Sequence, residues 1–100
     1  MPGDNLVFED FKDRVGSVFS MREEGIPAID LTLKQAELLS ARFARPGIRP
    51  PFALLFVGPA EPMLPQMLYN MVHGELGAIK LFIVPTGKDA NSVFYDCTFN

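Results

Sequence analysis

The sequence predicts a mainly β domain of the α+β class, with a six-stranded antiparallel sheet and one short N-terminal helix. Three observations support this prediction. Apolar and polar residues alternate with a period of two in several segments, most of these segments are joined by short connections, and no βαβ pattern is present. We expect the strands to form a meander that is strongly twisted or closed into a barrel, with the helix covering one end.

Length and composition predict one globular domain over residues 1–100. A chain of 100 residues has the size of a single core, and its 48% hydrophobic and 21% charged residues exclude disorder over most of its length. No apolar run is long enough to span a membrane, and the first residues lack the features of a secretory signal. Because a single cysteine suits a reducing compartment, we expect a cytoplasmic protein.

The predicted helix covers residues 5–15. Leu6, Phe11 and Val15 recur at helical spacing, charged residues fill the opposite face, and Gly16 is a suitable stop. The period then changes to two, which predicts strands over residues 18–21 and 29–33.

The middle of the chain contains one clear strand, residues 52–57, which we expect to be buried on both faces. Six of the nine prolines lie between residues 46 and 65 and predict stiff loops on both sides of it. Residues 34–44 admit two interpretations, because they favour a helix by propensity but can also end the preceding strand.

The C-terminal third predicts a hairpin and a final strand. Residues 67–73 and 78–84 are apolar runs around a turn with two glycines, which indicates a bulged or longer hairpin loop, and Pro85 is expected to end the second run. Residues 92–99 alternate and form the last strand. We expect the core to include Leu31, Leu33, Leu54, Phe56, Leu81, Ile83, Tyr95 and Phe99. Replacing Phe56 or Phe82 by alanine is expected to cost roughly 3–5 kcal/mol.

Several apolar and turn-forming motifs resemble a known family. The run from Arg49 to Pro59 (RPPFALLFVGP), the Leu64-Pro-Gln motif, the Leu76-Gly77 pair and the closing Tyr95 and Phe99 are similar to small bacterial domains of the DUF6916 family. The resemblance extends over most of the chain. It implies a stand-alone protein that is often encoded beside tail-collar or tail-fibre-like phage genes, and therefore a role in handling a protein partner.

Candidate chemistry is sparse. With one cysteine and one histidine, the chain lacks the residues for an intrachain disulfide or a Cys/His zinc site, and we expect no metal and no cofactor. His73, at the hairpin turn, can act as a base or bind a backbone carbonyl or water. Cys97 shares the apolar face of the last strand, so we expect a buried and inert thiol.

Two further groups of residues are candidates for binding. Arg45 and Arg49 lie in a basic, proline-rich stretch that can hold an anion or simply be solvated. Met67 and Met71, in the same run as Tyr69, form either part of the core or an exposed stripe for a peptide or a dimer.

These features favour a non-enzymatic accessory or adaptor protein that binds a protein or peptide, with the link to tail-fibre-like proteins implied by the resemblance. Two alternatives remain open: a precursor-peptide-binding accessory in a modified-peptide pathway, and a small enzyme that uses His73. The net charge of −3 argues against binding to nucleic acid or to an anionic membrane. The last strand has one charged residue and no proline, so we expect it to offer an open edge for a peptide or for homodimerisation.

Overall fold

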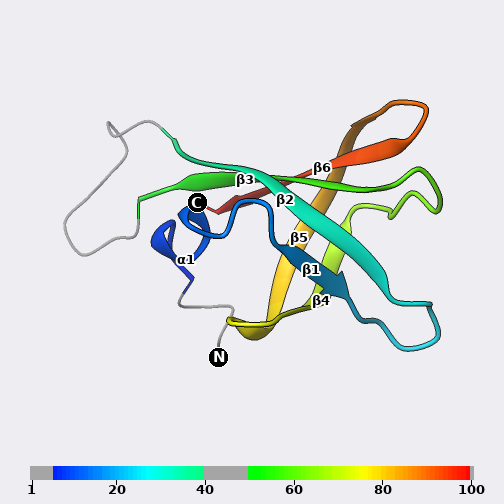
Figure 1. Ribbon diagram of the computed structural model, residues 1–100, viewed down its shortest axis with the longest axis horizontal. Helices are drawn as coiled ribbons and strands as arrows, with labels where there is room; N and C mark the ends of the chain where they lie inside the picture. Colours follow the sequence, from blue (N-terminus) through cyan, green and yellow to red (C-terminus); the bar gives the residue numbers. More distant parts are fainter. Residues whose placement is uncertain (1–5, 40–49, 100) are drawn as a thin grey trace.

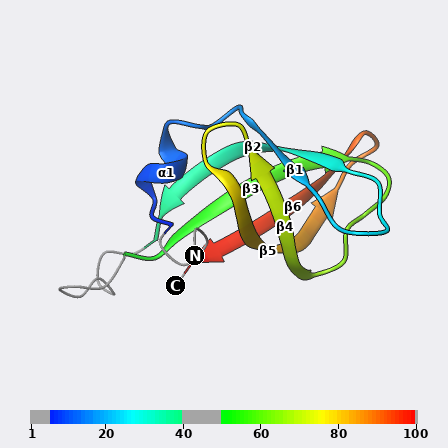
Figure 2. The same ribbon diagram turned by 90° about the horizontal axis from the view of Figure 1, so that it is seen from below.

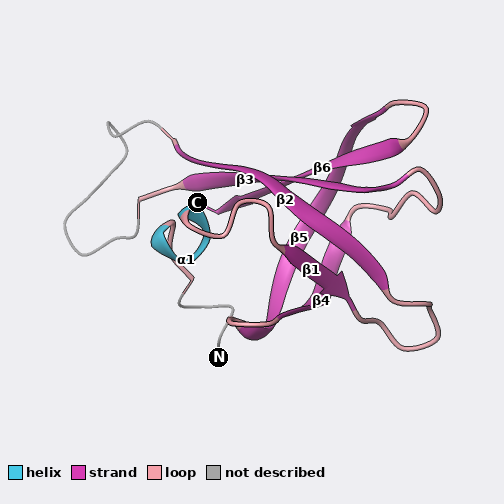
Figure 3. Cartoon of the chain, viewed as in Figure 1, coloured by secondary structure: helices cyan, strands magenta, loops and turns pink. Residues whose placement is uncertain are grey.

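The computed structural model describes residues 6–39 and 50–99, which form a closed six-stranded antiparallel barrel with one short helix (Figures 1 and 3). The mainly β fold class is therefore confirmed. The elements are α1 (Glu9–Lys12), β1 (Val18–Met21), β2 (Ile29–Leu38), β3 (Phe52–Pro59), β4 (Met67–His73), β5 (Gly77–Lys88) and β6 (Ser92–Phe99).

The barrel consists of two three-stranded meanders. The strand order is β1-β2-β3-β6-β5-β4, so β1 to β3 form one meander and β4 to β6 the other. The β3–β6 pairing runs from Phe52↔Phe99 to Pro59↔Ser92 along the full length of both strands. The β1–β4 pairing that closes the barrel comprises only Ser20↔Val72 and Met21↔Met71. One side of the barrel is thus joined much more extensively than the other.

Alternation along each strand separates an inner from an outer face. In β3, for example, Phe52, Leu54 and Phe56 are buried, whereas the residues between them are only half-buried. The prediction that this strand is buried on both faces is therefore wrong, because no second layer of the described residues covers the outer face of β3. Seven of the eight expected core residues are buried, and Phe99 is half-buried but stacks on Phe52 at a ring-centroid distance of 4.4 Å.

The helix α1 closes one end of the barrel and is shorter than predicted. Only Glu9–Lys12 is helical, and the fully buried Phe11 places its ring 5.8–6.0 Å from the rings of Phe19, Phe52 and Phe99. Beyond Lys12 the chain turns, and the N–H of Gly16 donates to the carbonyl of Leu33 on β2. The spacing of apolar residues predicts a helix up to residue 15, but the chain leaves the helix after Lys12 and bonds to β2 instead.

A loop closes the opposite end (Figure 2). Because β3 and β4 are not neighbours in the sheet, residues 60–66 must cross between the two meanders. Leu64 of this loop is buried and its N–H donates to the hydroxyl of Tyr95 at 2.9 Å, while the hydroxyl of Tyr69 donates to the carbonyl of Pro65 at 2.6 Å. The two tyrosines therefore hold the crossing loop over the barrel interior.

Two strands continue past the predicted ends. β2 runs to Leu38 with a bulge between Leu33 and Gln35, so a helix is wrong for residues 34–38, and residues 40–44 lie outside the described residues. β5 continues through Pro85 to Lys88, because a second bulge lies between Pro85 and Gly87. A bulge interrupts the ladder locally, so a proline that lacks an N–H can be accommodated there.

The structure places Phe56 and Phe82 on opposite faces of the barrel, although the sequence predicts the same loss of stability when either is replaced by alanine. Phe56 is fully buried, whereas Phe82 is 46% exposed on the outer face. We expect Phe56→Ala to lower the free energy of unfolding by roughly 3–5 kcal/mol, because it opens a cavity in the core, and Phe82→Ala to change it by about 1 kcal/mol or less. Urea denaturation of both variants measures this difference. Equal losses would contradict the assignment of these side chains to opposite faces.

Candidate functional site

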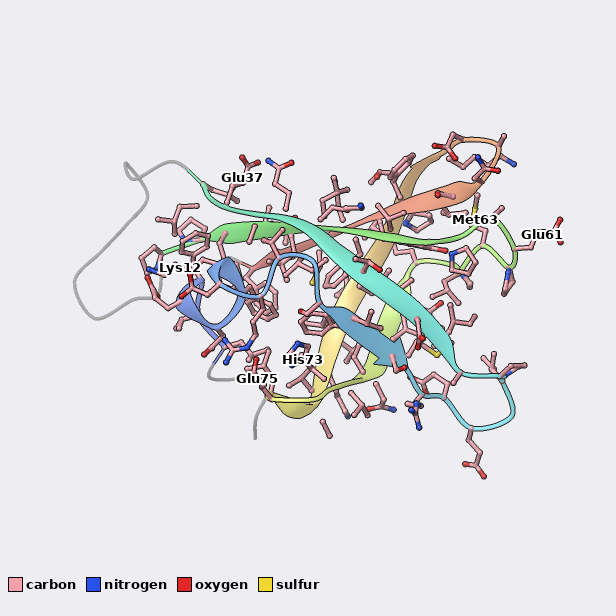
Figure 4. All side chains as sticks on the ribbon, in the orientation of Figure 1. Lys12, Glu37, Glu61, Met63, His73 and Glu75 are labelled. Carbon is pink, nitrogen blue, oxygen red and sulfur yellow. The ribbon has the colours of Figure 1, made fainter. Side chains whose placement is uncertain are left out.

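His73 is buried where β4 ends and the β4–β5 turn begins, beside Glu75 of that turn (Figure 4). Its Nδ1 accepts the backbone N–H groups of Glu75 at 3.0 Å and Leu76 at 3.2 Å. The ring proton must therefore be on Nε2, which lies 3.0 Å from the hydroxyl of Ser17. That hydroxyl in turn donates to the carbonyl of Arg14. Both ring nitrogens are engaged, so the histidine joins the α1–β1 connection to the β4–β5 turn.

The same histidine extends the short pairing that closes the barrel. We use the term β1–β4 seam for Ser20, Met21, Met71 and Val72, the residues of that pairing. Next to it, the rings of Phe19 and His73 are in contact at a centroid distance of 4.4 Å.

At the other end of the β1–β4 seam, the carbonyl of Asn70 accepts the N–H of Arg22 at 2.8 Å. The N–H and side-chain amide of Asn70 donate to the carboxylate of Glu23 at 2.7 and 3.3 Å. Side-chain hydrogen bonds thus continue the contact between β1 and β4 on both sides of its two paired positions.

Burial and charge both disfavour protonation of His73. Its pKa is lowered first by desolvation and then by the positive charge of Arg14, while Glu75 acts in the opposite direction. Arg14 and Glu75 also contact each other, with Nε 3.3 Å from Oε1. Burial and the two N–H groups that Nδ1 accepts thus favour the neutral imidazole, which fits a structural role.

The other candidate residues of β4 share its inward face but differ in burial. Tyr69 and Met71 are buried, and the pKa of Tyr69 is raised by desolvation, by Tyr95 and by Glu23. Met67 is 46% exposed at the start of the strand. The exposed Met67/Met71 stripe is thus wrong, because the alternation of β4 directs Met71 into the core.

Among the remaining candidates, Arg45 and Arg49 lie outside the described residues. Cys97 is buried as predicted, and desolvation is the main cause that raises the pKa of its thiol to about 12. The described residues contain no group of three or more His, Cys, Asp or Glu side chains that could hold a metal ion. In the same part of the chain, no helix has the length and apolar character needed to cross a bilayer.

The expected open edge on the last strand is also wrong. β6 pairs with β3 on one side and with β5 on the other, so its backbone groups are used within the barrel. A partner that adds a strand to residues 92–99 would have to displace one of these neighbours.

Sequence reasoning missed an apolar surface on the outside of β4 and β5. Leu68 pairs with Phe82, and Val72 pairs with Ala78, at outward-facing positions of the hairpin. All four are exposed, with exposed fractions of 53% for Leu68, 46% for Phe82 and 40% for Val72. We call these four residues the β4–β5 patch. The hairpin register was the signal that could have found it, because fixing Tyr69 and Leu81 as inward places Leu68 and Phe82 outward.

Comparison with known proteins gives one match. The family model described as a domain of unknown function, DUF6916, matches residues 6–99, which is nearly the whole chain. The chain belongs to the DUF6916 family. A search of the curated proteins and a search of the solved structures each found no match. The resemblance to the DUF6916 family inferred from the sequence is thus confirmed.

Burial of His73, which lowers its pKa, predicts a pH-dependent stability. Because its pKa is lower in the folded chain than in the unfolded chain, the unfolded state binds more protons between the two values. The free energy of unfolding is therefore expected to fall as the pH decreases below about 6.5, the ordinary pKa of histidine. In His73→Asn, the amide can still accept from the turn but does not titrate, and this decrease should be absent. Urea denaturation between about pH 7 and pH 5.5 measures the free energy of unfolding of both proteins. Since the chain has one histidine, the same decrease with pH in His73→Asn as in the wild type would contradict this assignment.

Burial of Cys97 predicts an unreactive thiol. In the native protein, labelling by a bulky thiol reagent at pH 8 is expected to be much slower than in urea, because the thiol is both inaccessible and protonated. Cys97→Ser should lower the free energy of unfolding by about 1–3 kcal/mol, since a hydroxyl is buried among apolar groups. Rapid labelling of the folded protein would show that this part of β6 opens.

Proposed function

We propose that this domain is a non-enzymatic accessory protein that binds a protein or peptide partner through the β4–β5 patch. The observation that carries the proposal is the exposure of Leu68 and Phe82, which lie directly opposite each other on adjacent strands. Contiguous exposed apolar side chains are common where a soluble protein contacts a partner. Their position on regular strands also gives the surface a defined shape before binding, which lowers the entropic cost of association.

The chemistry of the described residues supports binding over catalysis. In a catalytic role, His73 would need a ring nitrogen that can exchange a proton with a substrate. Its two nitrogens instead bind the β4–β5 turn and Ser17. The thiol of Cys97 is buried, and the hydroxyls of Tyr69 and Tyr95 hold the loop of residues 60–66. Each of these groups has a structural role in the barrel. This supports the accessory-protein hypothesis over the alternative of a small enzyme that uses His73.

The identity of the partner stays a prediction. A tail-fibre-like protein and the precursor peptide of a modified-peptide pathway are both compatible with an apolar binding surface. Co-expression with the products of neighbouring genes separates these two alternatives. A cytoplasmic location likewise stays part of the proposal, for which a reducing environment around the single cysteine is the supporting argument.

The proposal predicts that the β4–β5 patch is needed for binding but not for folding. The double variant Leu68→Ser/Phe82→Ser is expected to weaken the complex with a co-purified partner at least about tenfold, because two apolar contacts are lost. The matched control Val15→Ser/Ile26→Ser changes side chains that are 50% and 46% exposed outside the β4–β5 patch, and it should bind like wild type. Isothermal titration calorimetry measures the affinities, and urea denaturation confirms that both variants fold. Unchanged affinity of the Leu68/Phe82 variant would overturn the proposal.

A further inference from the structure

A polar row crosses the middle of the β4–β5 patch. Asn70 pairs with Lys80, and this pair lies between Leu68↔Phe82 on one side and Val72↔Ala78 on the other. Successive outward positions of a strand are two residues, or about 6.8 Å, apart. A partner that covers both apolar pairs must therefore also cover the polar row between them.

The polar row holds two cations that form no ion pair among the described residues. Lys80 is exposed, and Arg22, whose N–H donates to the carbonyl of Asn70, is exposed at the other side of the row. Within residues 6–39 and 50–99, neither cation forms an ion pair. The carboxylate of Glu23, beside Asn70, has both of its oxygens engaged in hydrogen bonds from Asn70. Lys80 and Arg22 are therefore cations without an ion-pair partner among the described residues, in a protein whose net charge is −3.

These two cations argue against a second copy of the chain as the occupant. In a symmetric dimer the same surface faces itself across a two-fold axis. An axis through the centre of the β4–β5 patch would place one Lys80 close to the other, with Arg22 beside them. Like charges that meet in a contact with little water are repelled, so the surface is better matched by a partner with a negative charge.

Building on the proposed function, we propose that the β4–β5 patch binds an extended segment in which an acidic side chain lies between two apolar side chains. The carboxylate of the segment pairs with Lys80, and its apolar side chains contact Leu68 and Phe82 at one end and Val72 and Ala78 at the other. In an extended chain, side chains on one face recur every second residue. The expected pattern is therefore an Asp or Glu with Leu, Ile, Val or Phe two residues before and two residues after it.

A random library of 12-residue peptides displayed on phage tests this pattern without knowledge of the natural partner. Selection on the wild-type domain is expected to enrich the apolar–acidic–apolar pattern. One enriched peptide is then synthesised with a fluorescent label, together with a version in which lysine replaces the acidic residue. Fluorescence anisotropy measures the binding of both peptides to the wild type and to Lys80→Glu. The matched control is Lys88→Glu, which changes an exposed lysine at the far end of β5.

Lys80→Glu is expected to weaken binding of the acidic peptide about three- to tenfold and to strengthen binding of the lysine peptide by a similar factor. Lys88→Glu should change neither by more than about twofold. Enriched peptides without the acidic residue, an absence of enrichment, or equal binding to Lys80→Glu would overturn this inference. The proposed function fails separately: peptides that bind Leu68→Ser/Phe82→Ser as tightly as wild type would show that the β4–β5 patch is not the binding surface.

Discussion

Closure of the sheet between β1 and β4 is the constraint on which the rest of this structure depends. The β3–β6 contact uses the full length of both strands, but the β1–β4 seam has only two paired positions. Glu23 and Asn70 continue the contact at one end, and Ser17 and His73 continue it at the other. Without this closure, β1 and β4 would be free edges, and the apolar face that they share would be open to water.

The same constraint explains the position of the single histidine. A residue at this corner must satisfy two donors of the β4–β5 turn and also reach the α1–β1 connection. A neutral imidazole does this because its two nitrogens have opposite roles and point in different directions. Burial of a polar group is tolerated where its hydrogen bonds are made. The hydrogen bonds that join the two ends of the barrel closure therefore explain the position of His73.

The strand alternation that fills the interior also determines what is left outside. Once Tyr69 and Leu81 face inward, Leu68 and Phe82 must face outward, and no second layer of the described structure covers them. The interior is built from apolar side chains and is closed at both ends, by Phe11 of α1 and by Leu64 of the crossing loop. The proposed binding surface lies on the outside of the barrel, where the apolar side chains of the β4–β5 patch flank Lys80.

The sequence by itself determined the fold class, the number of strands and most of the core, because a period of two depends only on neighbouring residues. It also placed Cys97 correctly inside. Only the tertiary structure decided that α1 is a single turn, that β5 continues past Pro85, and that β6 has no free edge. These outcomes depend on hydrogen bonds between segments far apart in the chain, such as Gly16 with Leu33. The β4–β5 patch lies between these cases, since the alternation that places Leu81 inward also places Phe82 outward, but only the pairing of the hairpin sets Leu68 beside Phe82.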